Sequence, residues 1–274
     1  MTTGEITQLL IFLISLTLLA IPLGSYMARV YAGLDTFLSP ILTPVEAFIY
    51  KRVGTVTGVD PTAEMGWKNY AFSMITFNAF GLILLYGLQR IQQVLPLNPE
   101  NLPGVEPHTA FNAAISFVSN TNWQSYGGET TLSYLTQMLG MSVQNFLSAA
   151  TGMAILAAFI RGFSRENSQT IGNFWVDLVR SLLYILLPLS TVLAIFLISQ
   201  GVTQTFSDSV EFTPLQSTTR VLPGENAHIH KIPLGPVASQ VSIKQLGTNG
   251  GGYFNSNSSH PLENPTPLSN FFEM

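Results

Sequence analysis

The sequence has no cysteine and very few charged residues. The absence of cysteine excludes disulfide bonds, thiolate metal sites and cysteine nucleophiles. Charged residues make up 9% of the 274 residues, whereas soluble domains carry roughly 25%, so much of the chain is predicted to lie in lipid. The formal net charge of −4 and the lack of a long Lys/Arg block argue against a nucleic-acid-binding protein, because phosphate contacts need clustered cations.

Four long apolar runs dominate what the sequence does contain. Each is long enough to cross a hydrocarbon core of roughly 30 Å, which needs about 20 helical residues. Pro22 and Gly24 are predicted to bend or end the first run. The predicted spans cover residues 6–30, 70–89, 130–160 and 181–207. The chain is therefore predicted to be an all-α, multi-pass integral membrane protein.

The basic residues predict the orientation of these spans, because Lys and Arg are enriched in cytoplasmic loops. One side of the membrane receives Arg29, Lys51, Arg52, Lys68, Arg161, Arg165 and Arg180. The other side receives Arg90, Arg220, Lys231 and Lys244. The N-terminus and the segments 98–128 and 208–274 are therefore predicted to lie on the extracytoplasmic side.

The two outer segments share a pattern. Each has a proline, then a short semi-apolar stretch, at residues 109–118 and 237–246, and then a Thr-Asn pair followed by glycines. The pairs are Thr121-Asn122 and Thr248-Asn249. The stretches are too short to span a bilayer but suit a re-entrant half-helix. The pattern is a weak internal repeat of span, half-helix, loop and span.

Loops of this composition suit an alkali cation. Gly, Asn, Thr and Ser can direct carbonyl oxygens at a dehydrated cation without a full negative charge at the site. Irregular backbone is tolerated at membrane depth where it lines a wet cavity, and consecutive glycines permit unusual dihedral angles. The alternative interpretation is that both loops are ordinary turns, which have the same composition.

Other residue patterns predict less. Residues 247–252 lack the GxxxxGK[ST] spacing of a phosphate-binding loop. His228 and His230 suit a solvated loop better than a metal site. Glu129 and Glu263 follow the two loops, where they either attract cations or accept hydrogen bonds from loop N–H groups.

Two charged residues lie just before the fourth apolar run. Asp177 and Arg180 lie about one helical turn apart and are expected to pair with each other. The sequence also lacks a Ser/His/Asp triad or a close carboxylate pair among its spans. The chain is therefore predicted not to be a catalyst.

Several long strings resemble signature segments of one family. They are SNTNWQSYGGETTLSY at 119–134, QNFLSAATG at 144–152 and GTNGGGYFNSNSSHPLENPT at 247–266, with PLNPENLPG at 96–104 and GPVASQ at 235–240. The chain resembles the N-terminal half of the potassium-binding A subunit of the bacterial Kdp potassium-transporting ATPase. This resemblance implies a fold of the potassium-transporter superfamily, with four repeats of span, pore loop and span around one pore. It also implies K+ as the transported ion and the bacterial inner membrane as the location.

The resemblance implies a role for particular residues and partners. Asn120, Thr121 and Asn122 would supply the first filter loop and Gln124 would support it. Thr248, Asn249 and Gly250 would supply the second filter loop. ATP hydrolysis would belong to a catalytic partner subunit, accompanied by small accessory subunits.

The resemblance also suggests an organisation for the chain. One membrane domain would comprise an N-terminal span and cytoplasmic loop (1–65), a first pore-loop repeat (66–165) and a second repeat lacking its closing helix (166–274). About two of four repeats are expected, so a second chain would carry the missing repeats. The alternatives are a non-transporting truncated fragment and a passive channel or symporter relative with the same pore loops.

Overall fold

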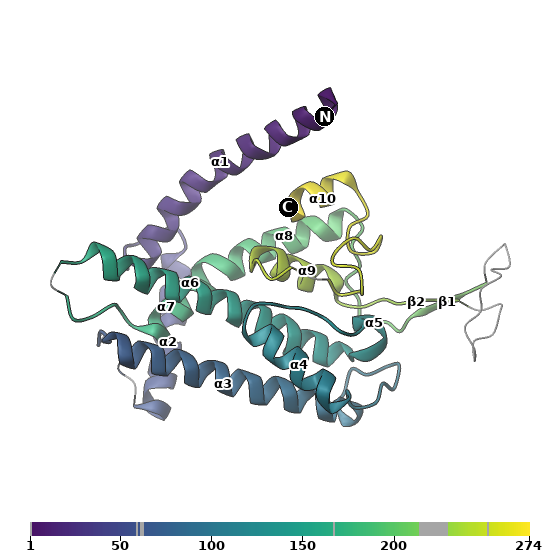
Figure 1. Cartoon of the computed structure of the whole chain (residues 1–274), viewed down its shortest axis with the longest axis horizontal. Helices are drawn as coiled ribbons and strands as arrows, with labels where there is room; N and C mark the ends of the chain where they lie inside the picture. The colour runs from purple at the N-terminus through teal and green to yellow at the C-terminus, as the bar shows by residue number, and fades with distance from the viewer. Residues whose placement is uncertain (1, 59, 61–62, 167, 214–229, 251) are drawn as a thin grey trace.

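The computed structural model describes all residues except 1, 59, 61–62, 167, 214–229 and 251. Most of the described chain is helical, as predicted (Figure 1). Its elements, in chain order, are α1 (Thr3–Tyr31), α2 (Ser39–Thr57), α3 (Trp67–Ile91), η1 (Gln92–Val94), α4 (Pro107–Val118), α5 (Gly128–Thr131), η2 (Thr136–Ser142), α6 (Val143–Ser164), α7 (Phe174–Arg180), η3 (Ser181–Leu186), α8 (Leu187–Ser199), β1 (Val210–Phe212), β2 (His230–Ile232), α9 (Val237–Leu246) and α10 (Pro267–Glu273).

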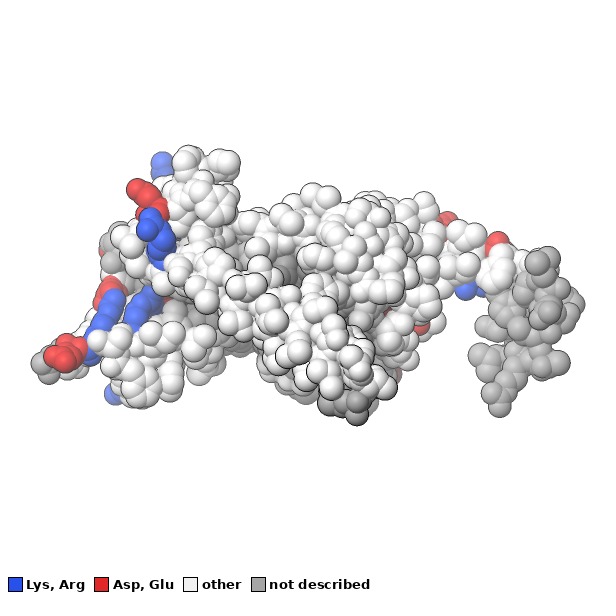
Figure 2. Space-filling view, turned by 90° about the horizontal axis from the view of Figure 1, so that it is seen from above, with Lys and Arg blue, Asp and Glu red and all other residues white. Residues whose placement is uncertain are grey.

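Within the described residues, four helical rods are long and apolar enough to cross a membrane, which confirms the number of predicted spans. They cover Thr3–Tyr31, Trp67–Val94, Thr136–Ser164 and Phe174–Ser199. In Figure 2 the charged side chains gather toward the two ends of the molecule, and a broad uncharged band separates them. Such a band matches a helical membrane protein, whose hydrocarbon-facing middle excludes charge.

The bounds of all four rods differ from the predicted spans. The third begins at Thr136 instead of residue 130, and the fourth ends at Ser199 instead of residue 207. The first helix passes through Pro22 and Gly24 to Tyr31, so neither residue ends it. The fourth rod begins at Phe174 instead of residue 181, because the Asn173 side chain accepts hydrogen bonds from the N–H groups of Trp175 and Val176 at 3.0 and 3.4 Å. Charged residues thus lie inside this rod, although the predicted span was an uncharged run.

Those charges do not pair with each other as expected. Asp177, 1% exposed, accepts two hydrogen bonds from Arg161 of α6, at 2.6 and 2.8 Å. Arg180 instead contacts Glu46 of α2 at 2.9 Å. Each charge therefore has its partner on a different helix, and these ion pairs join α7 to α6 and to α2.

Helix α2 was not predicted from the sequence. It lies in the charged segment between the first two spans and contains Pro44. Its Glu46 is buried and also accepts hydrogen bonds from the hydroxyl groups of Tyr50 and Tyr184, at 2.7 and 2.8 Å. A buried carboxylate needs such partners to offset its lost hydration. These bonds dock α2 onto η3.

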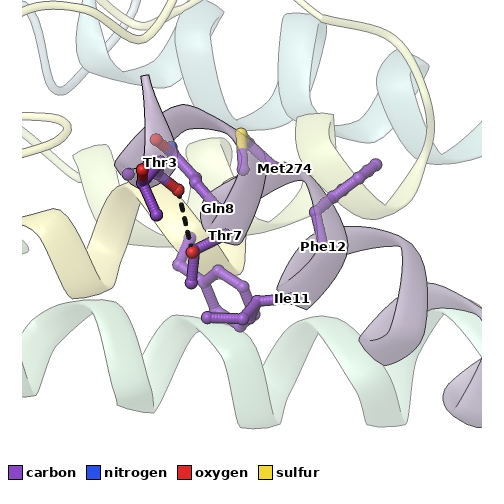
Figure 3. A pocket seen from close by; sticks show the side chains of 8 residues that line it. Thr3, Thr7, Gln8, Ile11, Phe12 and Met274 are labelled. Carbon is purple, nitrogen blue, oxygen red and sulfur yellow. Dashed lines mark hydrogen bonds between the residues drawn. The ribbon is translucent and has the colours of Figure 1, made fainter. Parts of the chain in front are cut away.

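Helix α1 is anchored mainly at its C-terminal end. The Tyr26 hydroxyl donates to the carbonyl of Tyr184 at 2.8 Å, and Tyr31 shares a hydrogen bond of 2.7 Å with Ser181. The rest of α1 extends away from the body of the molecule (Figure 1). At its N-terminal end, α1 lines a pocket together with Phe271 and Met274 near the C-terminus (Figure 3).

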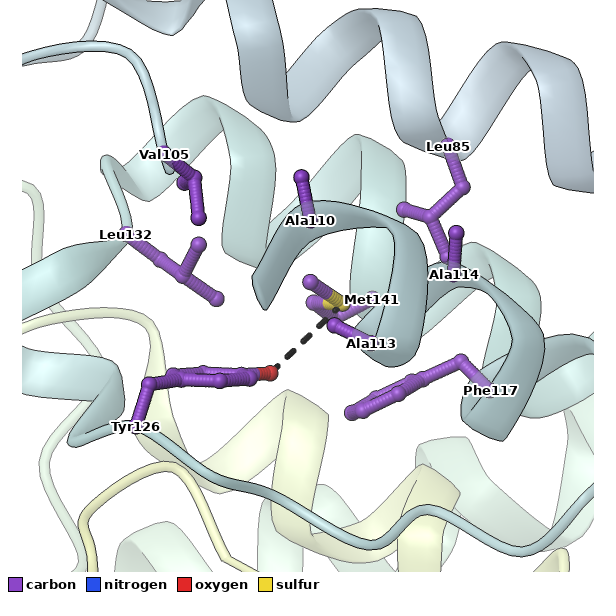
Figure 4. Close-up of a cluster of buried hydrophobic side chains, with 9 residues drawn as sticks. All are labelled: Leu85, Val105, Ala110, Ala113, Ala114, Phe117, Tyr126, Leu132 and Met141. Carbon is purple, nitrogen blue, oxygen red and sulfur yellow. Dashed lines mark hydrogen bonds between the residues drawn. The ribbon is translucent and has the colours of Figure 1, made fainter. Parts of the chain in front are cut away.

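The two short helices lie where the sequence predicted half-helices. The prediction for 109–118 is confirmed by α4, and that for 237–246 by α9. Helix α4 packs on α3, α9 packs on α8, and α6 contacts both. The α4 interface is built mainly from alanines, which allow close approach of helix backbones in membranes. Figure 4 shows this cluster: Leu85, Val105, Ala110, Ala113, Ala114, Phe117, Tyr126, Leu132 and Met141.

A small antiparallel hairpin adds the described strands to the predicted all-helical fold. Val210 of β1 pairs with Ile232 of β2. Glu100 contacts both sides of this hairpin. It accepts hydrogen bonds from the N–H and the hydroxyl of Ser209, and it forms an ion pair of 3.2 Å with Lys231. The Ser209 hydroxyl, followed by Lys231, lowers the pKa of Glu100.

The buried Arg161–Asp177 pair should contribute strongly to stability. We expect Asp177→Asn to lower the free energy of unfolding by about 3–5 kcal/mol, because it leaves a guanidinium without its counter-charge. Chemical denaturation in detergent micelles measures this change. The matched control is Glu64→Gln, which breaks the exposed pair between Arg165 and Glu64 and should cost less than about 1 kcal/mol. Equal losses in the two variants would contradict the prediction.

Candidate functional site

The two candidate loops follow the C-terminal ends of α4 and α9, and both begin with the same pattern of backbone hydrogen bonds. The N–H of Ser119 donates to the Ile115 carbonyl at 3.0 Å, and the N–H of Gly247 donates to the Ile243 carbonyl at 2.9 Å. Two residues later, the N–H groups of Thr121 and Asn249 reach the carbonyls of Ser116 and Lys244, at 2.9 and 3.0 Å. The loops are thus structurally equivalent at an offset of 128 residues, as from 119 to 247.

The backbone dihedral angles repeat at the same offset. In the first loop φ is +62° at Asn120 and +53° at Asn122, and in the second it is +55° at Thr248 and +70° at Gly250. A β-branched residue such as Thr248 seldom adopts this left-handed conformation, and such outliers are concentrated at functional sites.

This equivalence corrects the repeat that was read from the sequence. The Thr-Asn pairs at 121–122 and 248–249 are offset by 127 residues, one fewer than the structural offset. Asn120 corresponds to Thr248, and Thr121 corresponds to Asn249. Residues at the same number of positions after the helix end have the same backbone conformation, although their residue types differ. The predicted sets 120–122 and 248–250 nevertheless occupy matching positions.

The hydrogen bonds of the loops determine where their carbonyls point. In a trans peptide the C=O of one residue points opposite to the N–H of the next. The N–H groups of residues 120, 121 and 122 all donate back to the end of α4, so the carbonyls of residues 119, 120 and 121 point away from it. By the same reasoning, the carbonyls of residues 247 and 248 point away from the end of α9. No group in the described part of the chain donates to these five carbonyls.

The outward carbonyls of residues 119–121 and of residues 247–248 form two rows, one in each loop. Each row points in the same direction as the carbonyls of the preceding helix, α4 or α9. A helix C-terminus carries a partial negative charge of roughly half an elementary charge. This arrangement attracts a cation, and it repels the phosphate that a glycine-rich loop at a helix N-terminus would bind. The geometry therefore agrees with the rejection of a phosphate loop at 247–252.

The two loops meet through their side chains. The Ser148 hydroxyl of α6 donates to Asn120 Oδ1 at 2.9 Å and accepts from Asn249 Nδ2 at 3.3 Å. Asn249 Nδ2 also donates to Asn120 Oδ1. Ser148 was not singled out from the sequence, because a serine on an apolar helix carries no signal of its partners.

The other predicted site residues differ in their surroundings. Thr121 and Thr248 are exposed, and the Thr121 hydroxyl lies 2.9 Å from that of Ser119. Asn122 is buried, and its side-chain amide has no hydrogen-bond partner among the described residues. Gln124 donates to the Tyr126 hydroxyl at 3.4 Å. The described atoms leave the space beside Gly250 open.

Two buried charges brace the second loop from behind. Lys244 and Glu263 are both 0% exposed. The Lys244 ammonium donates to the Gly252 carbonyl, and a Glu263 oxygen accepts from the N–H groups of Tyr253 and Phe254. A Cβ added to Gly252 would lie 2.5 Å from Glu263 Oε2, so both charges contact the same turn of the loop.

These contacts bear on two residues that the sequence analysis named. Glu263 accepts hydrogen bonds from loop N–H groups, which is one of its two predicted roles. Lys244, which was assigned to the outer side of the membrane, is buried on α9 and bonds the second loop. Glu129 lies on α5, and one of its carboxylate oxygens is buried without a described hydrogen-bond partner. The His228 prediction lies outside the described residues.

Comparisons with known proteins agree on one family. The model of the family described as "Potassium-transporting ATPase A subunit" matches residues 10–274. Over 274 residues the chain is 57% identical to a protein of Herpetosiphon aurantiacus, covering 100% of this chain and 46% of that protein. It is 57% identical over 275 residues to a protein of Sorangium cellulosum, with 100% and 46% covered, and 53% identical over 293 residues to one of Methylococcus capsulatus, with 100% and 48% covered. Each relative is named "Potassium-transporting ATPase potassium-binding subunit", and the chain spans just under half their length.

The brace behind the second loop should behave as one unit. We expect Lys244→Met to lower the free energy of unfolding by about 3–5 kcal/mol, because it leaves the Glu263 carboxylate buried without a nearby cation. The double variant Lys244→Met/Glu263→Gln should lose at least about 1 kcal/mol less than the sum of the single variants. Denaturant titrations of the four proteins give this difference. The control Lys231→Met, at an exposed lysine, should change stability little, and strict additivity of the two buried substitutions would refute the brace.

Proposed function

Since the chain belongs to the potassium-transporting ATPase A subunit family, we propose that it binds K+ through the main-chain carbonyls of its two equivalent loops. The observation that carries this proposal is the pair of carbonyl rows at the ends of α4 and α9. Carbonyl oxygens can replace the water ligands of a weakly hydrated cation such as K+. Asn120, Thr121, Asn122, Thr248, Asn249 and Gly250 form these loops, and Gln124 supports the first.

We further propose that the chain is the non-catalytic, K+-translocating part of an ATP-driven uptake complex. This proposal is supported by the relatives, which are named as potassium-binding subunits of an ATPase. In the proposed complex a partner subunit hydrolyses ATP and small accessory subunits accompany it. Two loops supply half of a fourfold ring, so loops outside this sequence would complete it. ATP-dependent uptake in the assembled complex, as opposed to uptake driven by a gradient alone, distinguishes this role from that of a passive channel.

The division of the chain into repeats is part of the proposal. Residues 66–165 would form the first pore-loop repeat and residues 166–274 most of the second, preceded by the N-terminal span and loop of residues 1–65. The matching hydrogen bonds of the loops that follow α4 and α9 support one pore loop in each of the two repeats. Ion pairs at the inner ends of the spans would hold the repeats together.

We place both loops on the extracytoplasmic side of the inner membrane. This placement is supported by the excess of Lys and Arg predicted on the inner side. Lys244 is buried, so it is not one of the solvated loop residues to which that rule applies. The inner set is unchanged.

Binding of K+ should stabilise the chain in lipid nanodiscs. Since bound ligand stabilises a fold by about 2.7 kcal/mol at a hundredfold excess over Kd, we expect a higher unfolding temperature in K+ than in Na+ at equal ionic strength. Gly250→Ala should reduce this difference, because alanine disfavours the left-handed conformation. Gly201→Ala is the matched control: Gly201 also has a positive φ, +97°, and the described atoms leave open space beside it. Equal unfolding temperatures in the two salts, or an unchanged difference in Gly250→Ala, would refute the proposal.

The orientation can be tested with single cysteines, because the chain has none of its own. We expect Val210→Cys to react with a membrane-impermeant maleimide in intact cells. Lys51→Cys should react after permeabilisation, since it lies at the inner ends of the helices. The reverse pattern would place both loops on the cytoplasmic side.

A further inference from the structure

The hydroxyl of Ser148 lies where the two loops and α6 meet. Ser148 is 3% exposed, and α6 packs against both α4 and α9. The hydroxyl is 2.9 Å from Asn120 Oδ1 and 3.3 Å from Asn249 Nδ2. It also lies 3.3 Å from the Asn145 carbonyl of its own helix, which is the alternative acceptor for its single proton.

The three side chains form a closed ring of hydrogen bonds. An amide oxygen can accept two hydrogen bonds, an amide nitrogen can donate two, and a hydroxyl can do both. Asn120 Oδ1 accepts from Ser148 and Asn249, and Asn249 Nδ2 donates to Asn120 and Ser148. Asn120 Oδ1 and Asn249 Nδ2 therefore each make two hydrogen bonds within the ring. The ring joins the first loop, the second loop and helix α6.

The positions in the ring are adjacent to the proposed ion ligands. The carbonyls of Asn120 and Thr248 belong to the two outward rows, and Thr248 is bonded directly to Asn249. The side chains of Asn120 and Asn249 therefore fix the separation of the two rows. The ring joins non-equivalent residues, because the structural counterpart of Asn120 is Thr248.

Helix α6 packs closely on the second loop at Ala149, the residue that follows Ser148. A Cβ added to Gly247 would lie 3.2 Å from the Cβ of Ala149 and 2.2 Å from Asn249 Oδ1. From this closely packed helix the Ser148 hydroxyl reaches both amides.

We propose that Ser148 is a positioning residue that clasps the two loops into one unit and thereby sets the spacing of their carbonyls. It acts through Asn120 and Asn249 without touching the ion. The consequence for ions rests on the proposed function, whereas the clasp itself does not. A change in spacing alters the preference between K+ and Na+, because the two ions differ in their distance to oxygen ligands.

Amide hydrogen exchange of the chain in lipid nanodiscs, without added K+, tests the clasp. In Ser148→Ala we expect exchange to become about tenfold faster at residues 119–122 and also at 247–250, because the side-chain amides of Asn120 and Asn249 each lose a hydrogen-bond partner. Alanine is a good helix former, so α6 should remain folded. Ser148→Thr keeps the hydroxyl and should restore slow exchange in both loops.

Ser142→Ala is the matched control. Ser142 is a buried serine on the same rod, and its hydroxyl bonds the Gln137 carbonyl of that rod at 3.0 Å. Its replacement should leave both loops unchanged. Faster exchange in one loop alone, in neither loop, or equally in the Ser142 variant would overturn the clasp.

A second arm repeats the exchange in K+ and in Na+ at equal ionic strength. We expect the extra protection by K+ to shrink in Ser148→Ala and to return in Ser148→Thr, which loss of general stability would not produce. Parent protein that is protected equally by the two ions would overturn the proposed function. The exchange measured without K+ would still decide the clasp.

Discussion

Backbone N–H groups at membrane depth need a partner inside the protein, and in both loops they find it at the end of the preceding helix. Lipid supplies no competing donor or acceptor, so an unpaired group there is costly. The N–H groups of residues 119–122 and 247–249 donate back to α4 or α9, which leaves the carbonyls of the same peptides pointing the other way. The chemistry of the site thus follows from how the loop satisfies its donors, and the rest of the structure holds α4 and α9 in position.

The surrounding helices provide that support with few charges. Ion pairs among Arg161, Asp177, Arg180 and Glu46 connect α2, α6 and α7, while Lys244 and Glu263 brace the second loop. Buried charges are expensive in membranes and tend to persist where they have a role. In this chain each of these charges has a partner on another element or loop.

Much of this architecture could be predicted from the sequence, because hydropathy and proline placement are local signals. The four spans, α4 and α9 follow from the length of apolar runs, and the loops were identified from their glycines and amides. Helix α2 and the true start of the fourth rod were missed because their charges are neutralised by partners distant in sequence. Ser148 and Lys244 were missed as site residues because the loop groups that they contact are not adjacent to them in the sequence. Aligning the two loops by their Thr-Asn pairs gave an offset that was one residue too small, because equal residue types do not have equal backbone conformations in the two loops.

The equivalence of the loops also bears on how such a site can change during evolution. The same backbone is built from Ser-Asn-Thr-Asn in one loop and Gly-Thr-Asn-Gly in the other. A main-chain carbonyl is not encoded by any codon, so no point mutation can exchange it for another ligand. Inherited changes in ion preference would therefore arise in the side chains that support the loops. At one pair of equivalent supporting positions the two loops already differ, with serine at 116 and lysine at 244.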